Sequence, residues 1–160
     1  MDRNIFPLGP VSPGAPGKTP QKGGGSSGLP RGLRNNNPGN IEKGANWRGL
    51  SSQQTDSRFA QFISPQWGIR AMAIILRNYT VLHGINTIAG IVERWAPGHE
   101  NPTVTYADFV AERVGVNPNA EIDVVAALPR IIPAMIEFEN GVQPYGPGVI
   151  QEALELAGFA

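Results

Sequence analysis

The sequence predicts a mainly helical protein with a small loop-rich lobe, preceded by a disordered N-terminal arm. Between residues 64 and 157, apolar residues recur at helical spacing in segments bounded by capping or helix-breaking residues. The first 30 residues instead contain 13 Gly or Pro, a composition that cannot bury enough surface to offset its ordering entropy. We therefore divide the chain into an arm and linker (residues 1–30) and one compact helical domain (residues 31–160).

Local signals place the helix ends. Ser64 as N-cap and Pro65 at the first helical position open one helix, and Gly84 can cap it. The same kind of evidence predicts about six helices, over approximately residues 65–83, 87–96, 102–114, 119–128, 129–140 and 147–157. Pro133 should cost up to ~3 kcal/mol inside a helix unless it falls in the first turn or at a kink.

Two segments lack helical periodicity. Residues 31–46 are rich in Asn and Gly and contain the turn signal Pro38-Gly39, so we expect a loop there. Residues 58–63 are the only plausible short extended piece.

Composition excludes several function classes. Lys+Arg and Asp+Glu number 13 each, so the chain lacks the basic surplus of nucleic-acid-binding proteins. With no Cys and only His83 and His99, we expect neither a metal site nor another cofactor. The longest apolar run, residues 71–76, is far below the ~20 residues of a membrane span, and no signal peptide is visible at the N-terminus.

A candidate general acid stands at the end of the predicted 129–140 helix. Glycoside cleavage requires a carboxylic acid that is protonated near neutral pH, and an apolar setting raises the pKa of Glu from ~4.3 toward that range. Glu139 lies at i+4 from Met135 and i+3 from Ile136, on the apolar stripe of its helix. Taken alone it could be an idle boundary glutamate, but the polar, turn-rich segment of residues 140–145 favours a groove beside it.

Glu100 is the second candidate acid. It precedes the predicted third helix, where the helix dipole favours the carboxylate and lowers its pKa. It therefore suits a ground-state anion better than a general acid.

Candidate sugar-binding groups gather in the Asn-rich loop. Asn amides match the acetamido and hydroxyl groups of amino sugars, although Asn also stabilises turns, and structural use of most of them is the simpler interpretation. Trp95, at helical spacing, is expected to be buried, whereas Trp47 in a loop is the better aromatic platform. The candidate groove residues are Asn35, Asn36, Asn37, Asn40, Trp47, Tyr106 and Tyr145.

Several sequence blocks carry a family resemblance. In chain order they are residues 31–41 (RGLRNNNPGNI), Trp47-Arg48-Gly49, Phe59 with Phe62, Gly68-Ile69-Arg70-Ala71, Trp95-Ala96-Pro97, Glu100-Asn101 with Thr103 and Tyr106, and Glu139-Asn140-Gly141 with Pro144-Tyr145. This succession resembles a family of phage and prophage virion proteins described as structural proteins with lytic-transglycosylase or lysozyme character. More distantly, residues 36–41 are similar to a loop of cell-wall glucosaminidases, and residues 131–145 are similar to the Glu-bearing helix of soluble lytic transglycosylases.

The resemblance implies a lysozyme-like domain that cuts the MurNAc–GlcNAc strand of bacterial peptidoglycan with Glu139 as general acid and base. Glu100 would assist if water is the attacking group. The protein would be made in the host cytoplasm, belong to the phage particle and act at the host cell wall. The arm would be either an inert tail or a segment that binds other virion proteins. Two alternatives stay open, a capsid- or tail-associated structural protein without catalysis and a noncatalytic glycan-binding module.

Overall fold

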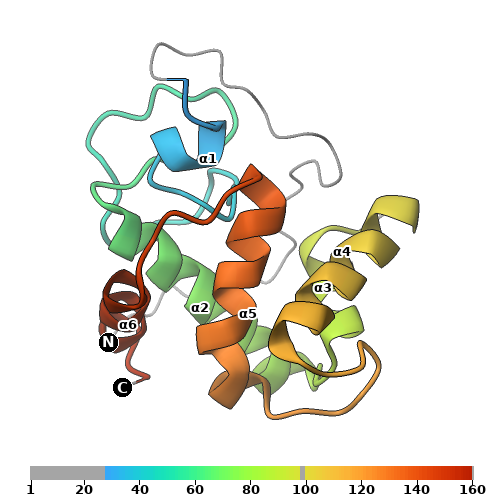
Figure 1. The fold of residues 1–160 in the computed structure, drawn as a ribbon. Coiled ribbons are helices and arrows are strands. Elements are labelled where there is room, and N and C mark those ends of the chain that lie inside the picture. Colours follow the sequence, from blue (N-terminus) through green and yellow to red (C-terminus); the bar gives the residue numbers. More distant parts are fainter. Residues whose placement is uncertain (1–27, 98–99, 160) are drawn as a thin grey trace.

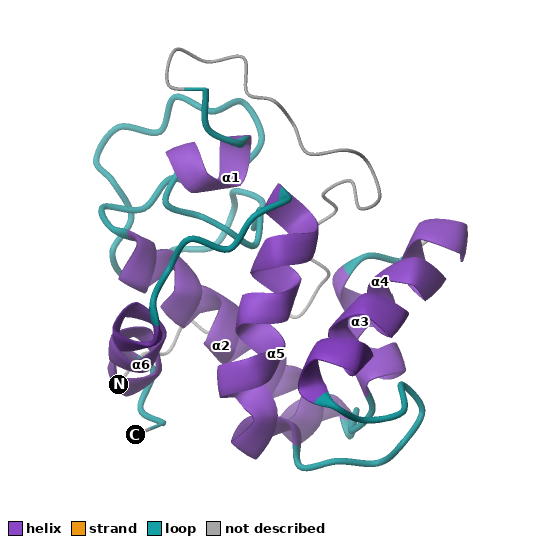
Figure 2. Cartoon of the chain, viewed as in Figure 1, coloured by secondary structure: helices purple, strands orange, loops and turns teal. Residues whose placement is uncertain are grey.

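The computed structural model describes residues 28–97 and 100–159, with the side chains of residues 100–104 outside the description. Residues 1–27 of the predicted arm also lie outside it. The described helices are α1 (Arg31–Arg34), α2 (Pro65–His83), α3 (Ile88–Trp95), α4 (Glu100–Val114), α5 (Val124–Asn140) and α6 (Pro147–Leu156). The prediction of a mainly helical domain with a loop-rich lobe is confirmed (Figures 1 and 2).

The helices pack around α2 and α5. α6 packs on α2, α5 packs on α2 and on α4, and α3 packs on α4. The loop-rich lobe, which contains α1, lies over the end of α5 that reaches Asn140 (Figure 1). Because α1 contacts α5 directly, the last turn of α5 lies where the lobe meets the helices.

α2 has the ends that its sequence predicts. Ser64 precedes Pro65 at the first position, and Gly84 follows the last residue with a φ of 69°. The middle of the helix is buried almost all round, so α2 is the central helix of the core. α3 and α4 also have predicted boundaries. Thr87 caps the start of α3 by accepting from the Gly90 N–H at 2.9 Å. α4 ends before Gly115, whose φ is 90°.

The prediction of two helices over residues 119–128 and 129–140 is wrong, because α5 runs through both Pro129 and Pro133. Asp123 caps it by accepting from the Ala126 N–H at 3.1 Å. The two prolines are four residues apart, so their missing N–H groups fall on one side of the helix. The packing of the buried side chains of α5 offsets this cost; they are Leu128, Ile131, Ile132, Met135 and Ile136.

The lobe has little regular structure. The segment predicted as loop begins with the one-turn helix α1, and residues 58–63 form no strand but contribute to isolated bridges, Glu42 with Phe59 and Leu50 with Phe62. Its apolar side chains Ile41, Phe59 and Phe62 are buried. The lobe is therefore held by these side chains and by side-chain hydrogen bonds to its backbone.

Gly68→Ala is expected to lower the free energy of unfolding by about 1–3 kcal/mol. Gly68 lies on α2 where the Asn-rich loop crosses, and a Cβ there would collide with the backbone carbonyl oxygen of Asn36. Chemical denaturation measures the change. Gly148→Ala in α6 is the matched control, because nothing lies within 4 Å of its Cβ position; an equal effect in both variants would contradict the close approach at Gly68.

Candidate functional site

Glu139 stands in the last turn of α5, with one hydrogen-bond donor on each carboxyl oxygen. The Asn40 Nδ2 donates to Oε1 at 3.1 Å, and the Tyr106 hydroxyl donates to Oε2 at 3.0 Å. These donors come from the loop lobe and from α4, and Glu139 as a whole residue is partly exposed. Three distant parts of the chain therefore meet at one carboxyl group.

Burial raises the pKa of Glu139 to about 7, since its surroundings disfavour the charged form. The hydrogen bonds from Asn40 and Tyr106 favour the ionised form and limit this rise. The indole N–H of Trp95 acts in the same direction, although it makes no hydrogen bond of normal geometry. All the groups that act on this pKa are neutral, so the loss of solvation on burial is what raises it. A carboxyl group that keeps its proton near neutral pH is what a general acid requires.

The two donors are themselves fixed. Tyr106 is fully buried and stacks on Phe138, with ring centroids 4.1 Å apart. Burial, reinforced by Glu139, raises the pKa of the Tyr106 hydroxyl well above its usual value, so this group remains a donor. Asn40 has a φ of 55°, and its N–H donates to the Asn37 carbonyl at 2.9 Å. Such left-handed backbone is one that Asn tolerates better than most residues.

Tyr106→Phe is expected to raise the pKa of Glu139 further, by about one pH unit, because the carboxylate loses one of its two donors. The titration of the Glu139 carboxyl carbon by ¹³C NMR measures this without any substrate. Tyr145→Phe serves as the control, since its hydroxyl makes no hydrogen bond to Glu139. A Tyr106→Phe midpoint equal to that of the wild type would show that this bond does not act on the acid.

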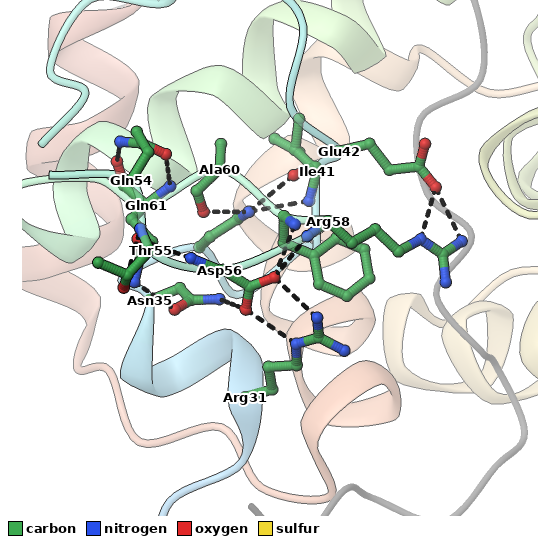
Figure 3. Close-up of polar contacts among 12 residues, drawn as sticks. Arg31, Asn35, Ile41, Glu42, Gln54, Thr55, Asp56, Arg58, Ala60 and Gln61 are labelled. Carbon is green, nitrogen blue, oxygen red and sulfur yellow. Dashed lines mark hydrogen bonds and ion pairs between the residues drawn. The ribbon is translucent and has the colours of Figure 1, made fainter. Parts of the chain in front are cut away.

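The other asparagines of the predicted groove have structural partners. Asn37 is fully buried and donates to the carbonyls of Ile41 and Ala60, both at 2.9 Å. Asn35 is 5% exposed and donates to Asp56 (Figure 3). Asn36, half-buried, donates to the Phe62 carbonyl. These partners agree with the simpler interpretation, in which most asparagines of this loop are structural. Of the four, Asn40 is the one whose side chain contacts Glu139.

Two aromatic residues of the predicted groove lie elsewhere. Trp47 is 3% exposed and belongs to the core, which corrects the expectation of an open platform, because its loop folds back over apolar residues. Tyr145 lines a separate hollow of about 340 Å³ between α5 and α6, with Pro129 and Pro133. Glu100 is the first residue of α4, and its side chain lies outside the described residues.

Sequence reasoning missed two residues that border the site. Asn140 is 2% exposed and donates to the Pro38 carbonyl at 2.9 Å, and Gly32 of α1 lies against its side chain. Both residues lie in sequence blocks that carry the family resemblance, but nothing in these blocks shows that the two meet beside Glu139. Contacts across about a hundred residues of sequence leave no periodic pattern.

The described residues offer no group of three or more His, Cys, Asp and Glu side chains placed to hold a metal ion. Among the same residues, no helix combines the length and apolar character needed to cross a bilayer.

Comparison with known proteins gives one relationship for the chain. No protein-family model matches it. It is 44% identical over 129 residues to Protein P5 of Pseudoalteromonas phage PM2, a match that covers 78% of this chain and 80% of that protein. At this identity and coverage, the chain belongs to the family of this bacteriophage protein.

Proposed function

We propose that this protein is a phage virion protein that cleaves the glycan strand of bacterial peptidoglycan, with Glu139 as general acid and base. The observation that carries the proposal is the carboxyl group of a partly exposed residue, with a pKa raised by burial to about 7 and two neutral hydrogen-bond donors. Membership of a phage protein family supports an action on the bacterial cell wall, since a phage must cross or break the wall of its host.

The proposed reaction uses one carboxyl group. Glu139 gives its proton to the glycosidic oxygen as the bond from the MurNAc anomeric carbon breaks. The carboxylate then takes the proton of the MurNAc C6 hydroxyl, whose oxygen bonds to that carbon and forms a 1,6-anhydro end. The acid is restored at the end of this sequence. If water attacks instead, the product has a reducing end, and Glu100 is the candidate second carboxylate.

The pair of donors suits both halves of the cycle. Each favours the carboxylate that forms after proton transfer, while burial favours the acid that begins the reaction. These opposing effects keep the pKa near the pH at which the group must both give and accept a proton. A sugar bound over Glu139 would exclude more water and raise the pKa further.

A second candidate is a virion structural protein without catalysis. The same two hydrogen bonds tie α5 to α4 and to the loop lobe, which is a structural use of a buried carboxyl group. The family relationship supports this function better than it supports catalysis, because it links the chain to a phage protein and indicates no enzymatic activity. Binding of the arm to other virion proteins is a prediction under either candidate.

Mass spectrometry of fragments released from purified peptidoglycan separates the candidates. The wild type is expected to release 1,6-anhydro or reducing-end muropeptides, and Glu139→Gln to release none above background. Equal release by both proteins would assign the acid to another residue, with Glu100 tested next. No release by the wild type between pH 4 and 9 would favour the structural candidate.

A further inference from the structure

Gly32 of α1 lies at a point where three oxygen atoms converge. A Cβ at this position would be 2.7 Å from Asn140 Oδ1 and 2.9 Å from both Asn40 Oδ1 and the Asn37 carbonyl oxygen. All three distances are shorter than a carbon–oxygen contact allows, so only the hydrogen of a glycine fits. A Cα–H group is also a weak donor toward such oxygens. The absence of a side chain at Gly32 therefore lets two carboxamides approach α1.

The first carboxamide, that of Asn140, is fixed at its nitrogen. Its Nδ2 donates to the Pro38 carbonyl at 2.9 Å and to the Ile136 carbonyl at 3.0 Å. The first of these bonds connects the end of α5 to the loop that carries Asn40. With Nδ2 held, Oδ1 must lie on the other side of the amide, where it is buried against Gly32 without a hydrogen-bond partner.

The second carboxamide, that of Asn40, connects the same point to the acid. Its Oδ1 is buried against Gly32 without a hydrogen-bond partner, and its Nδ2 donates to Glu139. Since the amide is a rigid plane, the place of the oxygen fixes the direction of the nitrogen. A displacement of Oδ1 would therefore turn the N–H away from Glu139.

We propose that Gly32 and Asn140 are positioning residues, which hold the Asn40 carboxamide so that it donates to Glu139. Gly32 supplies the space, and Asn140 closes it from the side of α5 while tying that helix to the Asn40 loop. The importance of this arrangement for catalysis rests on the proposed function. The hydrogen bond from Asn40 to Glu139 does not depend on that function, and it can be tested without substrate.

The test is a double-mutant cycle of Gly32→Ala and Asn40→Gly, with the Glu139 carboxyl titration by ¹³C NMR as the readout. Glycine accepts the φ of 55° at position 40, so Asn40→Gly removes the donor without backbone strain. Either single variant is expected to lower the ionisation constant of Glu139 about tenfold. The double variant is expected to match Asn40→Gly, because both changes remove the same bond. Gly148→Ala, in open space on α6, should leave the titration unchanged.

Two results would overturn the inference. One is a Glu139 titration midpoint in Gly32→Ala equal to that of the wild type. The other is a shift of this midpoint by Gly32→Ala that is equally large whether residue 40 is Asn or Gly. If Gly32→Ala alone does not fold, the double variant is used, because it lacks Asn40 Oδ1, one of the three oxygens that would crowd the new methyl group. Its Glu139 titration midpoint is then compared with that of Asn40→Gly. Equal midpoints are expected there, and a further rise would again overturn the inference. An inactive wild type with the expected titrations would contradict the proposed function and leave this inference standing.

Discussion

Glu139→Gln is expected to lower the rate of glycan cleavage by about 10²–10⁴-fold while leaving the protein folded. Glutamine keeps the shape of the side chain and an oxygen that can accept from Asn40, but it has no proton to give to a glycosidic oxygen. The rate of muropeptide release at constant substrate measures the loss. Glu137→Gln is the matched control, because Glu137 lies on the same helix in a half-exposed ion pair with Arg113.

The same variant should be more stable than the wild type above pH 7. The pKa of Glu139 is about 7 in the folded chain and ~4.3 when unfolded, so the folded state binds the proton more tightly. The contribution of the Glu139 carboxyl group to the free energy of unfolding is at its maximum below pH ~4.3 and is lost as the pH rises to about 7. A pKa difference of this size corresponds to a loss on the order of 3 kcal/mol. A neutral glutamine does not undergo this loss.

Urea denaturation at pH 5, 7 and 9 measures this difference. The advantage of Glu139→Gln should grow between pH 5 and 7 and then level off, whereas Glu137→Gln should follow the wild type. A parallel pH dependence in Glu139→Gln and the wild type would mean that the carboxyl is not desolvated. An active Glu139→Gln would remove this residue from the proposed mechanism, whatever its effect on stability.

The helix ends that could be predicted are those with strong local signals. Ser64, Pro65 and Gly84 define α2 without help from tertiary structure. α5 could not be predicted as one helix, because Pro129 and Pro133 break helices locally and the burial of its apolar side chains, a tertiary effect, offsets this. α1 was missed because one turn of helix has no periodicity to detect.

The candidate site was predicted in part for a similar reason. The apolar stripe of α5 places Glu139 on its buried side, which helical spacing alone can show. Its donors, Asn40 and Tyr106, were among the predicted groove residues, but their contact with the carboxyl depends on tertiary packing. Trp47 was misplaced because a loop lobe lacks the periodicity that distinguishes inner from outer positions.

Asp56→Ala is expected to lower the free energy of unfolding by about 3 kcal/mol. The Asp56 side chain is 9% exposed and joins α1 to the loop segment of residues 56–59 within the lobe (Figure 3). Oδ1 accepts from Arg31 Nη2 at 2.7 Å and from two backbone N–H groups, those of Arg58 and Phe59. Oδ2 accepts from Arg31 Nε at 2.9 Å and from Asn35 at 3.0 Å. Alanine leaves all these donors without their acceptor.

The effect of Asp56→Ala should depend on pH in the direction opposite to that of Glu139→Gln. The hydrogen bonds from Arg31, foremost among several donors, hold the pKa of Asp56 far below its usual value. A lowered pKa gives stability that is full above the unfolded value of ~3.9 and is lost as the pH falls through the folded value. The difference between wild type and variant should therefore be constant from pH 5 to 8 and shrink below pH ~4.

Chemical denaturation between pH 3 and 8 tests this, with Glu42→Gln as the control in the same lobe. Glu42 pairs with Arg58 at 2.8 Å, but 42% of its side chain is exposed, and exposed pairs contribute roughly 0–1 kcal/mol. A loss in Asp56→Ala no larger than that of Glu42→Gln would mean that the lobe does not depend on this carboxylate. The expected large loss would show that α1, which carries Gly32, is held in place by the carboxylate that pairs with Arg31.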